Sequence, residues 1–190
     1  MDKIVIDVET KNSFADVGGQ QFIKDLQASF VGVYSYNKDK YFSFFEDQFK
    51  ELEGFLKGAG LIVGFGLTRF DVPVMDKYFE MNFFSVPRLD ILDEIEMTAG
   101  RRISLNILAK TNIGIEKTQE SGLEAIRLYR EGKMEELEKY CLQDVRITKE
   151  IYDLTKKQGY LLVPNRVTGE NERVSLNFNE GEMIKSQSLF

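Results

Sequence analysis

Apolar and polar residues alternate over the first part of the chain. In residues 4–9 three aliphatic side chains face one way, and two carboxylates share the other face with a valine. This period of two predicts a strand. Residues 28–36 and 40–45 show further strand patterns, and the turn-forming residues 37–39 between them predict a hairpin.

Helical spacing begins after the hairpin. Apolar residues recur every three or four positions over 45–56, which predicts a helix that ends at the glycines of residues 58–60. Short apolar runs at 61–65 and 86–91 predict a fourth and a fifth strand. Between them a helix is expected after Asp71, because Pro73 suits its first turn.

The second half of the chain has the pattern of a helical region. We expect one short helix capped by Ser104, another opening at Ser121, and a long helix over residues 133–159. From residue 161 onward a β-hairpin is predicted around Gly169, and the final ten residues are expected to form a loose tail.

This order of elements indicates an α/β fold, with a mixed five-stranded sheet flanked by helices. The hairpin strands are expected to pair antiparallel, and the helix-linked strands to add in parallel by crossover. We expect one domain over residues 1–160, with residues 161–190 appended to it as a hairpin and tail.

The composition restricts the chemistry that is available. The 190 residues include no histidine and one cysteine, so histidine catalysis, histidine metal ligands and internal disulfides are all excluded. The net charge of −6 argues mildly against bulk attraction to nucleic acid, although carboxylates that bind cations would be neutralised by them. We expect no signal peptide and no membrane span, hence a cytoplasmic protein.

Four carboxylates and one phenol are the candidate catalytic groups. Asp7 and Glu9 are two apart, so they project from the same face of a strand. The alternative is that both are surface residues on a solvated face. Asp71 precedes a helix start, where an N-cap role is the alternative. Tyr140 and Asp144 lie one helical turn apart, although a boundary tyrosine beside a solvated carboxylate has the same spacing.

Taken together, these residues resemble the three motifs of the DEDD superfamily of 3′–5′ exonucleases, which have a ribonuclease H-like fold. The first motif resembles Asp-Val-Glu-Thr at 7–10, the second Gly-Leu-Thr-Arg-Phe-Asp at 66–71, and the third Tyr-Cys-Leu-Gln-Asp at 140–144. The tyrosine places the resemblance in the DEDDy branch, because the sister branch has a histidine where this chain has Lys139. The surrounding sequence is most similar to exonuclease domains of family B DNA polymerases and their free-standing relatives.

The resemblance implies two Mg²⁺ or Mn²⁺ ions and a two-metal-ion hydrolysis. It implies that Asp7 bridges the ions, that Glu9 and Asp144 complete one site, and that Asp71 holds the second ion. Tyr140 would orient the attacking water. The chain departs from the family at Gly66, where the second motif usually has Asn. This Asn is not a metal ligand in the family, so all four carboxylates are retained. The contact that the Asn would make with the substrate, or to order the loop, is the one affected.

Further residues near the motifs are candidates for substrate contacts. Thr10 and Phe14 could contact and stack on a terminal nucleotide, although a phenylalanine such as Phe14 is more often simply a core residue. Arg69 and Phe70 precede the last residue of the second motif, and Asp90 could support the site or cap a helix. Basic residues that could meet phosphates, or simply be solvated, include Arg69, Arg101, Arg102 and Lys117.

The function expected from these features is metal-dependent hydrolysis from the 3′ end of single-stranded DNA or RNA, releasing nucleoside monophosphates. A polymerase or a helicase is the kind of protein partner that such a domain would serve. A catalytically silent ribonuclease H-like module that binds nucleic acid or protein is the alternative. A ribonuclease H-like endonuclease is a third possibility, which the tyrosine at this spacing does not favour.

Overall fold

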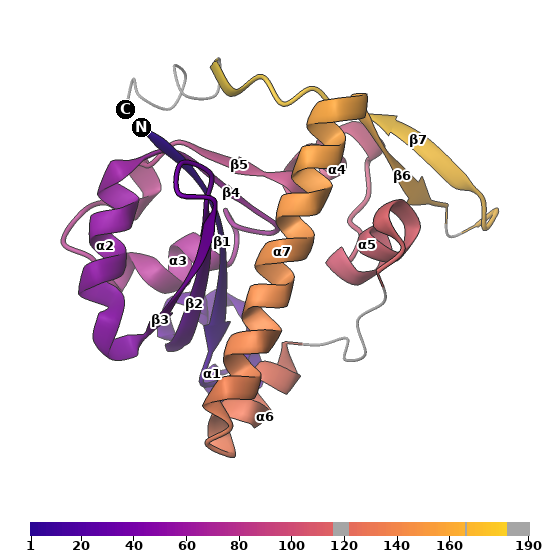
Figure 1. The fold of residues 1–190 in the computed structure, drawn as a ribbon. Coiled ribbons are helices and arrows are strands. Elements are labelled where there is room, and N and C mark those ends of the chain that lie inside the picture. The colour runs from indigo at the N-terminus through magenta and orange to yellow at the C-terminus, as the bar shows by residue number, and fades with distance from the viewer. Residues whose placement is uncertain (116–121, 166, 182–190) are drawn as a thin grey trace.

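A mixed five-stranded sheet forms the centre of the protein (Figure 1). The computed structural model describes residues 1–115, 122–165 and 167–181. Strand β1 pairs antiparallel with β2 and parallel with β4, and the full order is β3-β2-β1-β4-β5. The strands are β1 (Asp2–Thr10), β2 (Ala28–Ser35), β3 (Lys40–Phe45), β4 (Ala59–Gly64) and β5 (Arg88–Asp90). The predicted α/β fold with its mixed sheet is therefore confirmed.

Helices cover both faces of this sheet. In Figure 1, α2 and α3 lie on one side of it and α7 with α5 on the other. Within the described ranges, no helix combines the length and the apolar composition needed to span a bilayer. The α-helices are α1 (Phe14–Val17), α2 (Phe49–Gly58), α3 (Asp71–Met75), α4 (Ile91–Ala99), α5 (Leu105–Ile113), α6 (Leu123–Arg130) and α7 (Met134–Gln158). Short 3-10 helices are η1 (Gln20–Asp25), η2 (Glu46–Gln48), η3 (Asp76–Tyr78) and η4 (Phe83–Ser85).

The alternation in β1 explains why the sheet has two different sides. Ile4, Ile6 and Val8 are buried in the core that α2 and α3 share. Val5 points the other way, into the core that contains much of α7. Asp7 and Glu9 have the same parity as Val5, so their side chains project toward α7.

Helix α7 packs unusually close to the sheet at Gly32. Gly32 lies opposite Asp7 in the register of β1 and β2. A Cβ added to Gly32 would lie 2.9 Å from Val145 Cγ2 and 3.1 Å from Cys141 Sγ, which is too close for an ordinary contact. The absence of a side chain at this position therefore sets how near α7 lies to the first motif.

The C-terminal hairpin packs on the same core as α7. Strands β6 (Tyr160–Pro164) and β7 (Asn171–Ser175) pair antiparallel, as predicted, and Gly169 in the turn between them has a φ of 75°. Their buried residues join the α7-side core. The Asn112 side chain of α5 connects this helix to the hairpin through two hydrogen bonds. Its Oδ1 accepts from Leu162 N at 2.7 Å, and its Nδ2 donates to Leu162 O at 2.8 Å.

Some elements differ from their predicted extent. The helix expected from residue 45 begins as η2 and becomes α-helical only at Phe49. The fifth strand is three residues long rather than six, because Asp90 caps α4, a helix that the periodicity analysis did not predict. Ser121, expected to open a helix, lies outside the described residues, as do Lys117 and most of the expected tail, residues 182–190.

We expect Gly32→Ala to destabilise the protein, because the new methyl group must displace Val145 or Cys141. Overpacking of this kind lowers the free energy of unfolding by about 1–3 kcal/mol. Urea or thermal unfolding measures the loss, and Val145→Ala in the same chain should recover part of it.

The matched control is Gly54→Ala in α2, where an added Cβ meets nothing within 4 Å. This change should leave stability equal or raise it by about 0.5–1 kcal/mol, as expected for Gly to Ala in a helix. Equal effects of the two substitutions would contradict the close approach at Gly32.

Candidate active site

The five candidate catalytic residues line one cleft, of about 560 Å³. The cleft lies where the end of β1, the start of α3 and the first half of α7 meet. Three segments far apart in the sequence therefore contribute to one acidic site. The five residues are Asp7, Glu9, Asp71, Tyr140 and Asp144.

The β1 carboxylates lie beside a local irregularity of the sheet. The pairing of β1 with β2 shifts register between Glu9 and Thr10, and such bulges often redirect side chains near functional sites. Glu9 is only 7% exposed, and Asp7 is partly buried. The alternative of a solvated strand face is therefore wrong for this pair.

Asp71 begins α3 but does not cap it. The N-cap position belongs to Phe70 and makes no side-chain hydrogen bond, so the N-cap alternative for Asp71 is wrong. Burial raises the pKa of the Asp71 carboxyl well above its ordinary value, and the charges of Asp7 and Asp90 raise that pKa further. Backbone hydrogen bonds from Asp71 and Val8 oppose this rise, and the bond from Val8 ties the carboxylate to β1.

Tyr140 and Asp144 occupy the side of α7 that faces β1. Asp144 is 9% exposed, so it is not the solvated carboxylate of the alternative interpretation. Burial raises the pKa of the Tyr140 phenol, and the charges of Glu9, Asp144 and Asp7 raise it further. The Tyr140 phenol therefore stays protonated at neutral pH, so its hydroxyl can donate or accept a hydrogen bond.

Cys141 is a member of this site that the sequence motifs did not single out. Its Sγ donates to Asp7 Oδ2 at 3.3 Å and to the Asp7 carbonyl oxygen at 3.4 Å. Burial, followed by the charges of Asp7 and Glu9, raises the pKa of the thiol, so it keeps its proton. Cys141 is fully buried.

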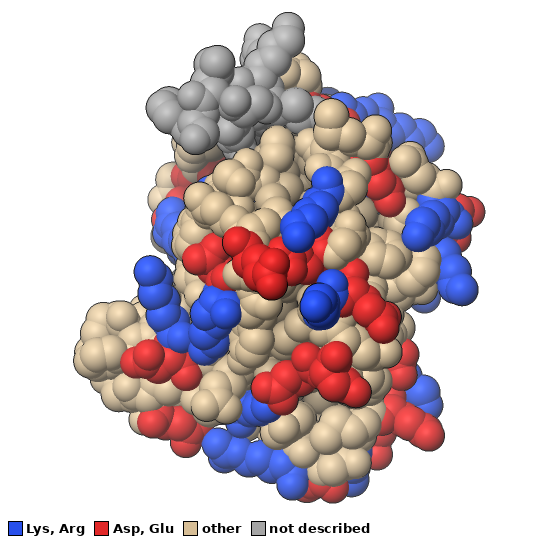
Figure 2. Space-filling model, turned by 90° about the vertical axis from the view of Figure 1, so that its left-hand side faces the viewer, with Lys and Arg blue, Asp and Glu red and all other residues tan. Residues whose placement is uncertain are grey.

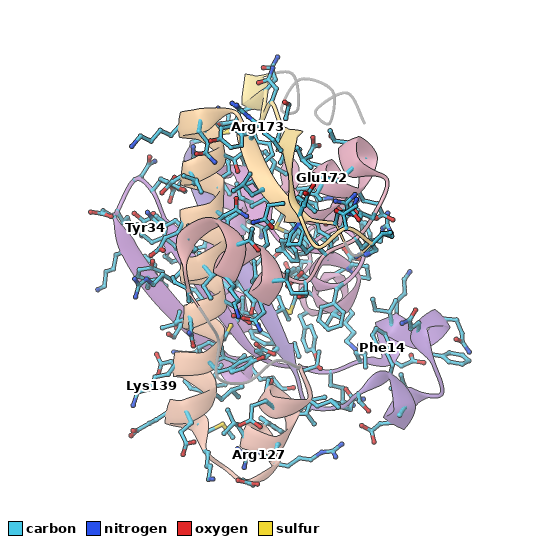
Figure 3. All side chains as sticks on the ribbon, turned by 90° about the vertical axis from the view of Figure 1, so that its right-hand side faces the viewer. Phe14, Tyr34, Arg127, Lys139, Glu172 and Arg173 are labelled. Carbon is cyan, nitrogen blue, oxygen red and sulfur yellow. The ribbon has the colours of Figure 1, made fainter. Side chains whose placement is uncertain are left out.

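Aromatic side chains form another wall of the cleft. Phe14 and Phe70 both line it, with ring centroids 6.0 Å apart in an edge-to-face arrangement. Figure 3 shows Phe14 on the arm that contains α1, on the opposite side of α7 from the exposed Lys139. Thr10 also lines the cleft, and its hydroxyl donates to the Asn12 carbonyl at 2.9 Å.

Other lining residues come from parts of the chain without a recognisable motif. They include Asn12, Ser13, Phe65, Leu105, Asn106, Leu123 and Ile126. Only tertiary packing brings the starts of α5 and α6 to this cleft, so no local sequence signal identifies these residues.

The candidate phosphate-binding arginines form ion pairs with neighbouring carboxylates. Arg69 does not line the cleft and instead pairs with Asp93 at 3.4 Å and Glu96 at 2.9 Å, both on α4. Arg102 also pairs with Glu96, and Arg101 pairs with a glutamate of the C-terminal hairpin. A substrate contact by Arg69 stays a prediction, and it would require rearrangement of these pairs.

The donor set suits a hard divalent cation. Ligand atoms of Asp7, Glu9 and Cys141 lie within 4.8 Å of one another, and the carboxylates of Asp71 and Asp144 open into the same cleft. The four carboxylates offer oxygen ligands, which Mg²⁺ and Mn²⁺ prefer, whereas the Cys141 sulfur is a soft donor that these ions do not select. Buried carboxylates this close together repel one another unless a cation or a proton neutralises them.

Comparisons with known proteins agree with the architecture. Residues 7–156 match the RNase_H_2 family of the RNase_H superfamily. The chain belongs to the RNase H superfamily. A search of curated protein sequences finds no significant match.

The fold of this RNase H superfamily protein is similar to part of a larger enzyme. The family B DNA polymerase from the hyperthermophilic archaeon Pyrobaculum calidifontis superimposes with a TM-score of 0.61 at 14% sequence identity. The match covers 82% of this chain but only 24% of the polymerase chain. At this identity the similarity establishes a shared fold.

We expect the metal-free protein to lose stability as the pH rises. Because the pKa of Asp71 is raised above its ordinary value of 3.8, the folded state keeps a proton that the unfolded chain has released. Stability should therefore fall as the pH rises from about 4 toward the raised pKa. In EDTA at pH 8, Asp71→Asn should raise the melting temperature by about 2–4 °C, equivalent to about 1 kcal/mol.

Thermal unfolding with and without Mn²⁺ measures this effect. The exposed Asp25→Asn is the control and should change neither condition. In Mn²⁺ the wild-type protein should gain stability and Asp71→Asn should gain less. A variant that is less stable than the wild type in EDTA would contradict the raised pKa.

Proposed function

We propose that this chain is a 3′–5′ exonuclease of the tyrosine branch of the DEDD superfamily. It would hydrolyse phosphodiester bonds at the 3′ end of single-stranded nucleic acid with two Mg²⁺ or Mn²⁺ ions. The observation that carries the proposal is the cleft in which four carboxylates from β1, α3 and α7 meet one neutral tyrosine. Membership in the RNase H superfamily supports a nuclease in general.

Each carboxylate has a place in this proposal. Asp7 interacts with two other parts of the cleft, because its charge raises the pKa of Asp71 and its Oδ2 accepts from Cys141 Sγ of α7. The residues that would hold the ions are Asp7, Glu9, Asp71 and Asp144, whose carboxylates line the same cleft. When bound, the divalent ions would neutralise this cluster and supply the Lewis acidity that phosphodiester hydrolysis needs.

Tyr140 would position the attacking water. Its raised pKa keeps the hydroxyl protonated at neutral pH, so it can donate or accept one hydrogen bond without removing the proton of the water. Glu9 and Asp144 line the same cleft as Tyr140, which supports this assignment.

The rest of the cleft fits the end of a strand rather than a long duplex. A volume of about 560 Å³ is in the range of sites for one small ligand, such as a terminal nucleotide. Phe14 and Phe70 offer ring surfaces to a base, and Thr10 offers a hydroxyl. Figure 2 shows acidic and basic side chains interspersed on the face around α2, so that face does not supply a uniformly positive field.

A catalytically silent binding module is the second candidate function. The observation that favours it is Gly66, which stands where the resemblance leads one to expect an asparagine. Retention of all four carboxylates and of Tyr140 in one cleft favours the enzyme.

One assay separates these functions. Oligonucleotides of DNA and RNA, labelled at the 5′ or the 3′ end, are incubated with the protein in Mg²⁺, Mn²⁺ or EDTA. Stepwise shortening of the 5′-labelled strand and early loss of the 3′ label, both abolished by EDTA and by Asp7→Asn, support the exonuclease. Binding without cleavage would support the silent module, and internal cuts would support an endonuclease.

We expect Tyr140→Phe to lower turnover by about 10- to 100-fold, because loss of the hydroxyl leaves the water without its positioning contact. Mn²⁺ binding, measured by calorimetry, should stay close to that of the wild type, since the carboxylates are unchanged. Tyr41→Phe, on the remote strand β3, is the matched control and should keep full activity. Full activity of Tyr140→Phe would show that the assigned role is wrong.

A further inference from the structure

A buried carboxylate outside the proposed ligand set binds the turn that leads to Asp71. Asp90 is the last residue of β5 and lies opposite Gly64, the last residue of β4. It is only 5% exposed. From this position its side chain reaches past the end of β4 to the turn formed by residues 65–70.

The Asp90 carboxylate accepts backbone hydrogen bonds from two directions. From the first turn of α4, Leu92 N and Asp93 N donate to Oδ1 at 3.0 and 3.4 Å. From the turn before α3, Gly66 N donates to Oδ1 and Thr68 N to Oδ2, both at 2.8 Å. Capping α4 uses only Oδ1 of Asp90. The second oxygen, Oδ2, binds the turn before α3, and the two shortest of the four hydrogen bonds also go to that turn.

This turn determines where α3 begins. Gly66 has a φ of +81°, a left-handed conformation that favours glycine. Its carbonyl oxygen accepts from Arg69 N at 3.2 Å and Phe70 N at 3.0 Å, which closes the chain into the start of the helix. Helix α3 has five residues and no side-chain N-cap, so its direction depends on the preceding turn.

We propose that Asp90 is a positioning residue for Asp71. By binding both N–H groups of the turn, it would hold the Asp71 carboxylate against β1, facing Asp7. The inference rests on the proposed function, because it assigns Asp90 a role in the metal affinity and turnover of that site. It also gives a reason why glycine at position 66 is compatible with an ordered turn, since the contact uses the backbone of Gly66.

Two substitutions separate this role from helix capping. Asp90→Ser retains a good N-cap side chain for α4 but has a single, shorter oxygen and cannot also bind the turn. Asp90→Asn keeps the size of the side chain and replaces one acceptor oxygen by an amide donor, which opposes one N–H of the turn. The second variant keeps the test informative if the first folds poorly.

The matched control is Asn112→Ala on α5. Like Asp90, Asn112 makes several hydrogen bonds to backbone groups, with Leu108 O, Leu162 O and Leu162 N. It does not line the cleft. Loss of its bonds should therefore reduce thermal stability without changing the metal site.

The decisive readout is Mn²⁺ affinity, measured by electron paramagnetic resonance on the full chain without substrate. We expect Asp90→Ser to weaken Mn²⁺ binding about 10- to 100-fold, as for other residues that orient metal ligands. With a 5′-labelled oligonucleotide at saturating Mn²⁺, kcat should fall while KM changes little. Asp90→Asn should show the same pattern more weakly, and Asn112→Ala should match the wild type in both readouts.

The outcomes distinguish failure of this inference from failure of the proposed function. If the wild type binds Mn²⁺ and shortens the oligonucleotide while Asp90→Ser behaves like Asn112→Ala, the positioning role is wrong. If the wild type neither binds Mn²⁺ nor cleaves, the proposed function is wrong. The role of Asp90 in that function is then wrong as well. Amide exchange at Gly66 and Thr68 then shows whether Asp90 holds the turn at all: protection should be lost in Asp90→Ser.

Discussion

The contact between α7 and the sheet at Gly32 is the interaction on which the candidate site depends. Because Gly32 has no side chain, Cys141 and Val145 of α7 approach β2 at a distance that a methyl group would prevent. Gly32 is paired with Asp7, so this contact lies directly beside the first acidic motif. On α7, Tyr140 directly precedes Cys141 and Asp144 directly precedes Val145, so the close approach of the helix also brings these two residues to the cleft.

The same packing has an electrostatic consequence. It brings several carboxylates into a partly buried cleft, where desolvation and mutual repulsion raise the pKa of Asp71. Burial, followed by the charges of neighbouring carboxylates, raises the pKa values of Tyr140 and Cys141, so both residues keep their protons beside the acidic groups. Such an arrangement is unfavourable without neutralising charge, and divalent cations at the carboxylates would supply it. Metal binding at these carboxylates would therefore be coupled to stability through one cluster.

Much of the fold could be predicted from local patterns, because each pattern has a direct physical cause. Alternation in β1 assigned its two faces correctly, and spacings of three and four over residues 133–159 located α7. The fifth strand was overestimated because Asp90 ends it by capping α4, and capping depends on the backbone beyond the apolar run. The motifs also selected five residues that line one cleft, since their spacings require a shared side of a strand or helix.

What could not be predicted depends on contacts between distant segments. Asp71 precedes a helical segment in a way that suggests an N-cap, and only the structure shows its carboxylate buried against β1. Arg69 lies within the second motif, yet its ion-pair partners lie on α4. The contacts of Cys141 with Asp7 and of Asp90 with Gly66 join residues 134 and 24 positions apart.

The most direct test is a crystal structure with Mn²⁺ and a nucleoside monophosphate, with data collected at the manganese absorption edge. Anomalous scattering locates manganese independently of any assumption about the ligands. We expect two peaks in the cleft, with Asp7 contacting both, Glu9 and Asp144 beside one, and Asp71 on the side of the other. Manganese elsewhere on the protein, or a cleft in which the four carboxylates do not contact the metal, would contradict a two-metal nuclease site.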